Sequence, residues 1–287
     1  MNRRKKGISS AFSLLICTLM LTALARAPGG SFSVSAGPQD PTGAAVIRAV
    51  GGPALTLAGE FRGVRLCVLN CPLAAQGYKA EVCAEMSAQK NAARAVREAL
   101  RLLPEGMTDA LADYAGPFAV LLCGQLRSQS ALLPDLPRAC LADCGGMLLL
   151  LIDCGSGGAY HSAVHELCHL TDRALAAAAA DDPSHWSEAG WLALCPEGFS
   201  YYGAYMDGEG RPYSESASPA FTAEEGPESA YFVSRYSKTF PTEDRATLME
   251  ALVRLGGDSA LMRSGHLTRK AEYYRAAIDY YLCGGRK

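Results

Sequence analysis

The sequence contains one short motif, His165-Glu166-Leu167-Cys168-His169, whose spacing restricts the local fold more than any other feature. In an α-helix, residues four positions apart lie on the same face, so a helix here presents both imidazoles side by side. Two imidazoles in this arrangement suit one Zn²⁺ ion, and Glu166 follows the first of them, where it can accept a proton from a zinc-activated water. The motif therefore predicts a helix with His165 and His169 as metal ligands.

The residues around the motif favour a strand, a turn and then a helix. The apolar run from Met147 to Ile152 is typical of a buried strand, and the glycines between Gly155 and Gly158 interrupt the chain after it. Residues 160–180 suit a helix because they end in an alanine-rich run, and Pro183 follows shortly after. This order is the setting that a zinc peptidase requires.

A third histidine, His161, lies on the same helical stripe but is not expected to bind the same metal. It precedes His169 by eight residues, which corresponds to about 12 Å along a helix. Both rings would need to lie ~2.0–2.1 Å from one zinc ion. We therefore expect His161 to lie outside the metal's ligand shell or at the surface.

The first 27 residues have the layout of a secretory signal peptide. Basic residues from Arg3 to Lys6 precede an apolar stretch from Ile8 to Leu24, and Ala25-Arg26-Ala27 offers a cleavage site with small residues. We therefore predict a secreted or cell-surface protein. The alternative is an uncleaved membrane anchor, because the apolar stretch approaches the length of a spanning helix; only in that case would the protein bind a membrane.

The charge that remains after this segment argues against a nucleic-acid partner. Residues 1–27 hold five Lys and Arg residues and no acidic one, so Lys plus Arg fall from 27 to 22 against 29 Asp plus Glu. The resulting net charge of about −7 lacks the basic face that nucleic acids require. Beyond Cys17 there are ten cysteines, and an even number in an exported chain permits disulfides whose connectivity stays open.

The remaining pattern predicts an α+β chain. We expect the signal peptide at 1–27, a flexible spacer at 28–59 and one domain at 60–287, with a small sheet over the motif helix and a helical C-terminal part. Strands are expected at 64–69, 118–122 and 147–152, and irregular structure at 124–145 and 183–227. Besides the motif helix, helices are expected at 81–103, 108–114, after Thr242, which can cap its helix, and at 268–282.

Two histidines do not complete a catalytic zinc site, which normally has three protein ligands. Three carboxylates after the motif are candidates for the third. Glu188 lies 19 residues beyond His169, near the spacing of thermolysin-type enzymes, but its neighbours do not indicate a regular helix. Glu197 lies in an irregular stretch, whereas Glu243 begins a well-formed predicted helix.

A family resemblance ranks these candidates. The motif is followed by Trp191-x3-Cys195-Pro196-x-Gly198-Phe199-x-Tyr201, and later by Phe232-Val233-Ser234-x-Tyr236 ahead of Glu243-Asp244-x-Ala246. Together these segments resemble exported bacterial zinc metallopeptidases, which are similar to the catalytic domain of anthrax lethal factor, a gluzincin. The resemblance covers residues 145–250 and implies a zincin-like fold, with Glu243 as third ligand and Tyr236 assisting at the transition state. The family has a further glutamate where this chain has Thr247.

The sequence therefore predicts a secreted zinc-dependent metallopeptidase acting on a peptide or protein substrate. Zn²⁺ would be held by His165, His169 and Glu243. Glu166 would be the general base, and Tyr236 would donate a hydrogen bond to the oxyanion. The alternatives are a non-catalytic exported zinc-binding module, a cell-surface interaction module, and amide hydrolysis of a non-peptide substrate by the same chemistry.

Overall fold

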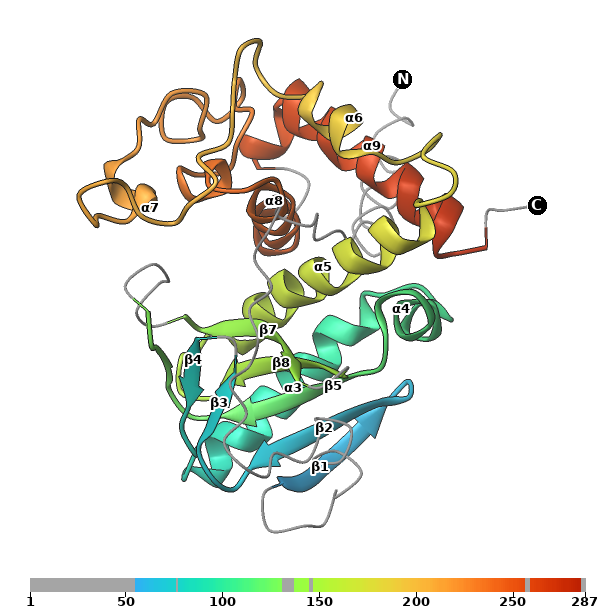
Figure 1. Cartoon of the computed structure of the whole chain (residues 1–287), viewed down its shortest axis with the longest axis vertical. Helices are drawn as coiled ribbons and strands as arrows, with labels where there is room; N and C mark the ends of the chain where they lie inside the picture. Colours follow the sequence, from blue (N-terminus) through green and yellow to red (C-terminus); the bar gives the residue numbers. More distant parts are fainter. Residues whose placement is uncertain (1–54, 76, 131–136, 145–146, 256–258, 285–287) are drawn as a thin grey trace, which may run out of the picture. The chain divides into compact units, whose positions relative to one another are not determined.

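A computed structural model describes residues 55–75, 77–130, 137–144, 147–255 and 259–284 (Figure 1). The predicted signal peptide and residues 28–54 of the predicted spacer lie outside these ranges. The described residues have a mixed α+β fold, as the sequence predicted. No helix within these ranges combines the length and the apolar character that crossing a bilayer would demand.

The chain divides into two compact units. The sheet unit contains the described residues of 55–101 and 108–166, and the helical unit contains those of 102–107 and 167–284. The division falls within helix α5 (Ala159–Ala178), whose first residues belong to the sheet unit and whose remainder belongs to the helical unit. The geometry along α5 itself is that of one continuous helix.

The sheet unit is built on a mixed five-stranded sheet in the order β1–β2–β5–β8–β7. Its central strands β2, β5 and β8 are parallel, whereas β1 and β7 are antiparallel at the two edges. The central strands are mostly buried and rich in leucine and valine, as expected for strands covered on both faces. The bounds are β1 (Leu55–Phe61), β2 (Val64–Leu69), β5 (Phe118–Cys123), β7 (Ala139–Cys144) and β8 (Met147–Asp153).

A second, smaller antiparallel sheet packs on one face of the first. It has the order β3–β4–β6, with β3 at Leu73–Ala75, β4 at Tyr78–Ala80 and β6 at Leu126–Ser128. Ala80 and Leu126 from this sheet lie in the same apolar core as alternate residues of β5 and β8, because side chains two positions apart share a face. The small sheet thereby closes one side of the core.

Two helices occupy the connection between the small sheet and β5. Helix α3 (Met86–Arg101) contacts β1 and β5. Its buried residues recur every three or four positions, as expected for one face of a helix. They are Ala92, Ala93, Val96, Ala99 and Leu100. Helix α4 (Met107–Ala115) follows after a short turn.

The helical unit combines long and short helices with a long irregular segment. Its elements after α5 are α6 (Glu188–Leu192), α7 (Tyr213–Ser216), η1 (Tyr236–Lys238), α8 (Pro241–Leu255), η2 (Leu261–Arg263) and α9 (Gly265–Tyr281). Trp191, Phe232 and Tyr274 are among its largest fully buried side chains. Helix α9 is capped by Ser264, whose hydroxyl accepts hydrogen bonds from two backbone amides of the first turn.

The predicted helices and strands are largely present, with several differences. Residues 55–59 of the predicted flexible spacer belong to β1, so the spacer prediction was wrong there. The helix predicted at 81–103 begins at Met86, and the segment 183–227, predicted to be irregular, contains the short helices α6 and α7. Residues 124–145 contain β6 and β7, so the prediction of irregular structure there was wrong. The sequence of β7, ACLADC, has little strand propensity of its own; its pairing with β8 along the whole strand determines its conformation. Helix α8 begins at Pro241, a favoured first helical residue, so Thr242 lies inside the helix and is not its cap.

Candidate metal centre

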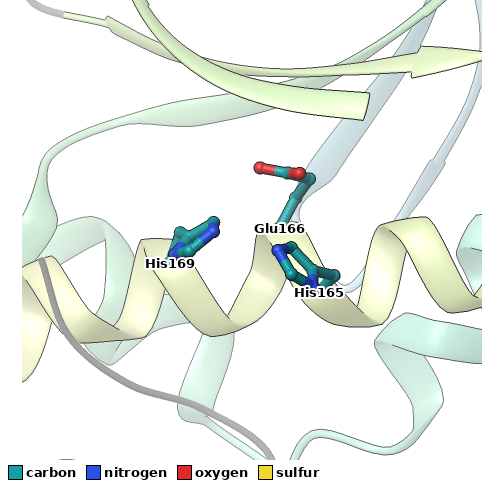
Figure 2. A group of neighbouring side chains, drawn as sticks. All are labelled: His165, Glu166 and His169. Atoms are coloured by element: carbon teal, nitrogen blue, oxygen red, sulfur yellow. The ribbon is translucent and has the colours of Figure 1, made fainter. Parts of the chain in front are cut away.

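Helix α5 presents the motif as the sequence predicted. The ligand atoms of His165, Glu166 and His169 all lie within 4.8 Å of one another, and this group can hold a metal ion (Figure 2). Glu166 and His169 are buried, whereas His165 is half-buried. The two imidazoles are neighbours because one helical turn separates them. His161, which was expected to lie outside the metal's ligand shell or at the surface, is half-buried, and its ring meets the ring of Tyr160 edge-on.

Glu166 also has a neighbour in the edge strand of the large sheet. Burial raises the pKa of the Cys140 thiol in β7 well above its usual value, and the negative charge of Glu166 is the next largest cause. The negative charge of Glu166 therefore disfavours ionisation of the Cys140 thiol.

Glu243 approaches the second motif histidine from helix α8. Its Oε2 lies 3.5 Å from Nε2 of His169, and the whole residue is 3% exposed. Its other oxygen, Oε1, accepts a hydrogen bond of 2.7 Å from the hydroxyl of Tyr205. One carboxylate oxygen is therefore fixed by a tyrosine while the other faces the imidazole.

The other two candidate ligands have different positions. Glu188 is the first residue of α6, and both of its carboxylate oxygens accept hydrogen bonds from Arg245, at 2.9 and 3.2 Å. Glu197 is exposed in a turn that follows α6. Among the three candidates, an ion pair with a motif histidine is found for Glu243 within the described part of the chain.

Tyr236 lies in the same neighbourhood, in the short helix η1. Its ring stacks on that of Tyr205, with centroids 6.0 Å apart and planes 18° apart. Phe240 meets the Tyr205 ring at an angle, with centroids 4.9 Å apart. Tyr205 was not among the predicted site residues, because it lies in an irregular aromatic stretch where no helical or strand spacing singles it out.

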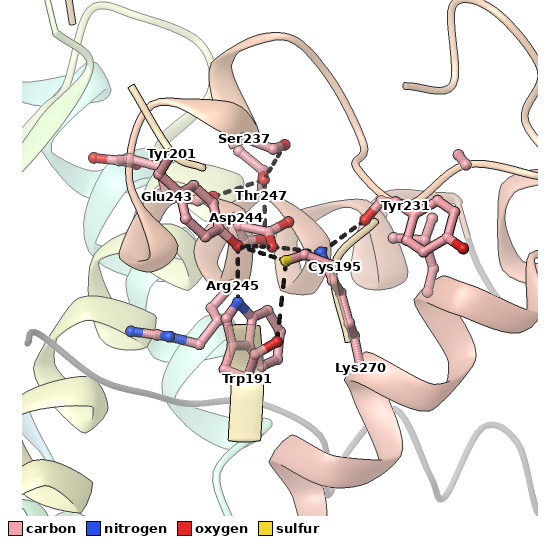
Figure 3. A network of polar contacts seen from close by, with 12 residues as sticks. Trp191, Cys195, Tyr201, Tyr231, Ser237, Glu243, Asp244, Arg245, Thr247 and Lys270 are labelled. Atoms are coloured by element: carbon pink, nitrogen blue, oxygen red, sulfur yellow. Dashed lines mark hydrogen bonds and ion pairs between the residues drawn. The ribbon is translucent and has the colours of Figure 1, made fainter. Parts of the chain in front are cut away.

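The two residues after Glu243 are charged and fully buried. Asp244 accepts hydrogen bonds from the ammonium of Lys270 and the hydroxyl of Tyr201, both at 2.6 Å (Figure 3). Burial raises the pKa of the Asp244 carboxyl, whereas Lys270 and Tyr201 act in the opposite direction. Lys270 is itself fully buried, so this pair links α8 to α9 without contact with water.

Arg245 makes the second buried link. Its guanidinium donates to Asp172 of α5 at 3.1 Å and to Glu188 of α6 at 2.9 Å. Burial acts to lower its pKa, but these two carboxylates raise it overall, so the guanidinium stays charged. Asp172 follows His169 by three residues and so shares its helix face. Two adjacent cross-helix pairs therefore join α5 to α8: His169 with Glu243, and Asp172 with Arg245.

The aromatic residues of the irregular segment surround these buried cations. The Arg245 guanidinium lies 5.3 Å from the ring centroids of both Trp186 and Trp191. The Lys270 ammonium lies 4.1 Å from the ring of Phe232. Such cation–π contacts favour a charge that has lost its water. These aromatic side chains pack the helical unit.

Thr247 makes local contacts near the start of α8. Its hydroxyl donates to the backbone oxygen of Glu243 at 2.7 Å and exchanges a hydrogen bond of 2.6 Å with Ser237. The residue thereby ties η1 to the first turn of α8, as Figure 3 also shows. It supports the position of Glu243 through the backbone.

No protein family, curated protein or solved structure matches this chain. The resemblance to gluzincin peptidases therefore stays a prediction, and the geometry of the described residues carries the functional argument.

The buried pair of Asp244 and Lys270 makes a prediction about stability. Lys270→Met removes the positive charge and leaves Asp244 buried without it, which is expected to lower the free energy of unfolding by about 3–5 kcal/mol. Lys79→Met, which removes a pair whose lysine side chain is 47% exposed, is the matched control and should cost less than about 1 kcal/mol. Urea unfolding of both variants measures the difference, and equal losses would contradict the role given to the buried pair.

Proposed function

We propose that this chain is a zinc-dependent metallopeptidase with a zincin-like fold and a gluzincin set of ligands, acting on peptides or proteins outside the cytoplasm. The observation that carries the proposal is the approach of the Glu243 carboxylate to within 3.5 Å of His169, one helical turn from His165. A carboxylate from a separate helix beside an H-E-x-x-H pair is the arrangement expected of a catalytic zinc site with two histidines and one glutamate.

The donor atoms fit zinc. Two imidazole nitrogens and one carboxylate oxygen form a mixed nitrogen and oxygen set, and three protein ligands leave a position open for a reactant. The hydrogen bond from Tyr205 to Glu243 is the kind of outer contact that orients a metal-binding carboxylate. The cysteine of the motif, Cys168, is buried, and its thiol contacts the Tyr274 hydroxyl at 3.6 Å.

Glu166 is the residue of the motif that supports catalysis over a purely structural role. When bound, Zn²⁺ would supply a Lewis acid that polarises the scissile carbonyl and acidifies water. Glu166 takes a proton from the attacking water and passes it to the leaving amine. A structural metal site has no use for such a base.

Two tyrosines have separate tasks in this proposal. Tyr236 donates a hydrogen bond to the oxyanion that develops on the substrate carbonyl. Tyr205 does not contact the substrate; it holds Oε1 of Glu243 so that Oε2 stays directed at the metal position. The stacked rings keep the two hydroxyl-bearing side chains in a fixed relation.

Glu166→Gln is expected to retain zinc and to lose hydrolysis. The amide keeps the shape of the side chain but accepts no proton, so peptide cleavage should fall by about 10²–10⁴-fold while zinc stoichiometry stays unchanged. Peptide-library cleavage followed by mass spectrometry, with metal analysis of the same samples, measures both. The exposed Glu197→Gln is the control and should behave as wild type; full cleavage by Glu166→Gln would remove the mechanism.

The identity of the third ligand is tested by two matched variants. Glu243→Gln removes a charged ligand, so its zinc dissociation constant should rise by more than the roughly 10–100-fold that an outer contact is worth. Glu188→Gln alters a partner of Arg245 and should leave zinc affinity unchanged. Titration against a competing chelator measures both constants. The reverse order of effects would make Glu188 the ligand.

The two tyrosines are distinguished by which quantity changes. Tyr205→Phe removes the hydrogen bond to Glu243 and is expected to weaken zinc binding by about 10-fold. Tyr236→Phe should leave zinc affinity intact and lower kcat by about 10²–10³-fold. Tyr202→Phe, which removes a hydroxyl from a neighbouring ring stacked on Tyr213, is the control. A loss of zinc affinity in Tyr236→Phe, with none in Tyr205→Phe, would exchange the roles.

A further inference from the structure

The net charge of the chain conceals a local concentration of cations on helix α3. Its positive residues recur at intervals of four, three and four positions, which places them on one side of the helix. They are Lys90, Arg94, Arg97 and Arg101, whereas Glu98 is the single acid of this helix. At the α-helical rise per residue, the four cations form a stripe about 16 Å long. The stripe lies outside the side that α3 buries, and three of its four cations are exposed.

The sheet unit as a whole is not basic. Its described residues include nine Lys and Arg and nine Asp and Glu, so their formal charges cancel. The excess of negative charge lies in the helical unit, whose described residues include ten Lys and Arg against seventeen Asp and Glu. The stripe is therefore a local feature of α3, and the net charge of the chain does not reveal it.

The hairpin of β1 and β2 adds a fifth cation beside the stripe. Arg62, in the turn between the two strands, donates to the backbone carbonyl of Leu100 in α3 at 3.4 Å. The guanidiniums of Arg62 and Arg101 lie 5.6 and 5.4 Å from the ring centroid of Phe61. Attraction to the shared ring favours two like charges in one place. The five cations together are called the basic face: Arg62, Lys90, Arg94, Arg97 and Arg101.

A glycine in β1 makes room for Arg97. The guanidinium of this residue donates to the carbonyl oxygen of Ala58 at 3.4 Å, so it lies against the strand. A Cβ atom at Gly59 would collide with Nη2 of Arg97. Gly59 also has a φ of 153° and lies where the register of β1 on β2 shifts, as in a β-bulge. The strand therefore holds the Arg97 guanidinium in place on the basic face.

Several cations of the basic face keep donors for an outside anion. No described residue forms an ion pair with Lys90. Arg94 donates to the side-chain oxygen of Asn91 at 3.2 Å, which is a neutral partner. Arg101 pairs with Glu98 at 2.7 Å, but both side chains are exposed, and such a surface pair contributes little. An external anion can therefore contact these cations without displacing a buried partner.

We propose that the basic face is a docking surface for a linear acidic polysaccharide. Its cations follow a line along α3 and do not converge on one point, so they match an anionic chain better than a single small anion. Four of the five are arginines, whose planar guanidiniums bind carboxylates in a bidentate manner. Asn91, exposed beside the stripe, offers an amide to sugar hydroxyls. The proposal does not rest on the candidate metal centre.

The distribution of charge favours a polysaccharide over two other anionic partners. Nucleic acids carry a phosphate at every nucleotide and are bound by domains with a strong excess of positive charge. The sheet unit has no such excess, and a single stripe of cations matches a polymer whose charges are separated by neutral sugar groups. Helices that bind membrane surfaces insert an apolar side into the lipid, whereas the apolar side of α3 is buried within the unit.

The test measures the fluorescence anisotropy of a labelled heparin oligosaccharide while the full chain is added. The wild-type protein should bind this probe, with an affinity that falls as the NaCl concentration is raised. Lys90→Glu/Arg94→Glu reverses two exposed charges of the basic face and should raise the Kd by about 10-fold or more. Lys79→Glu/Arg127→Glu makes the same change of charge at paired, exposed positions of β4 and β6. This control should bind as the wild type does at physiological salt, and thermal unfolding checks that both variants are folded.

Three outcomes would overturn the proposal. One is no binding of heparin by the wild type at low salt, and another is an equal Kd for the two double variants. The third is tighter binding of single-stranded DNA, or of vesicles that contain phosphatidylglycerol, with loss of that binding in Lys90→Glu/Arg94→Glu; the basic face would then serve another class of partner. None of these measurements depends on zinc content or peptide cleavage, so the proposed function and this proposal fail or stand separately.

Discussion

Two buried ion pairs hold the first turn of helix α8, and the geometry of the candidate metal centre depends on them. Asp244 pairs with Lys270 of α9, and Arg245 pairs with Asp172 of α5. A buried charge that loses its partner is strongly destabilising, so few arrangements of these helices satisfy both pairs. Glu243 precedes the two anchored residues, and its direction is set by them. We infer that the Glu243 carboxylate, the proposed third ligand, is placed by a network of buried charges next to it in sequence.

The same face of helix α5 contributes both a histidine of the candidate metal centre and a carboxylate of the buried charge network. His169 lies 3.5 Å from Glu243, and one turn later Asp172 pairs with Arg245, so the contact proposed to hold the metal and a buried ion pair lie side by side. Any shift of α8 along α5 would break both. The hydroxyl of Tyr205 adds a further constraint by fixing one oxygen of Glu243. These contacts fix Glu243 relative to His169, which is the preorganisation that the proposed metal site would require.

Sequence reasoning succeeded where structure follows from local spacing. The H-E-x-x-H pattern determines that His165 and His169 share a helix face, and the apolar run of β8 identifies a buried strand. It failed where tertiary pairing decides: β7 is a strand because β8 pairs with it, and Tyr205 is recognisable only from its contact with Glu243. Glu188 has a sequence spacing that suits a ligand, yet both of its carboxylate oxygens accept hydrogen bonds from Arg245, which lies far away in the sequence.

X-ray absorption spectroscopy of the purified, zinc-loaded chain tests the central claim most directly. The account predicts one zinc per chain with nitrogen and oxygen neighbours at about 2.0–2.2 Å, two of them imidazoles. The chain also offers many cysteines, so the contrary result is easily recognised. A first shell dominated by sulfur at about 2.3 Å, or no bound zinc, would contradict a centre built on His165, His169 and Glu243.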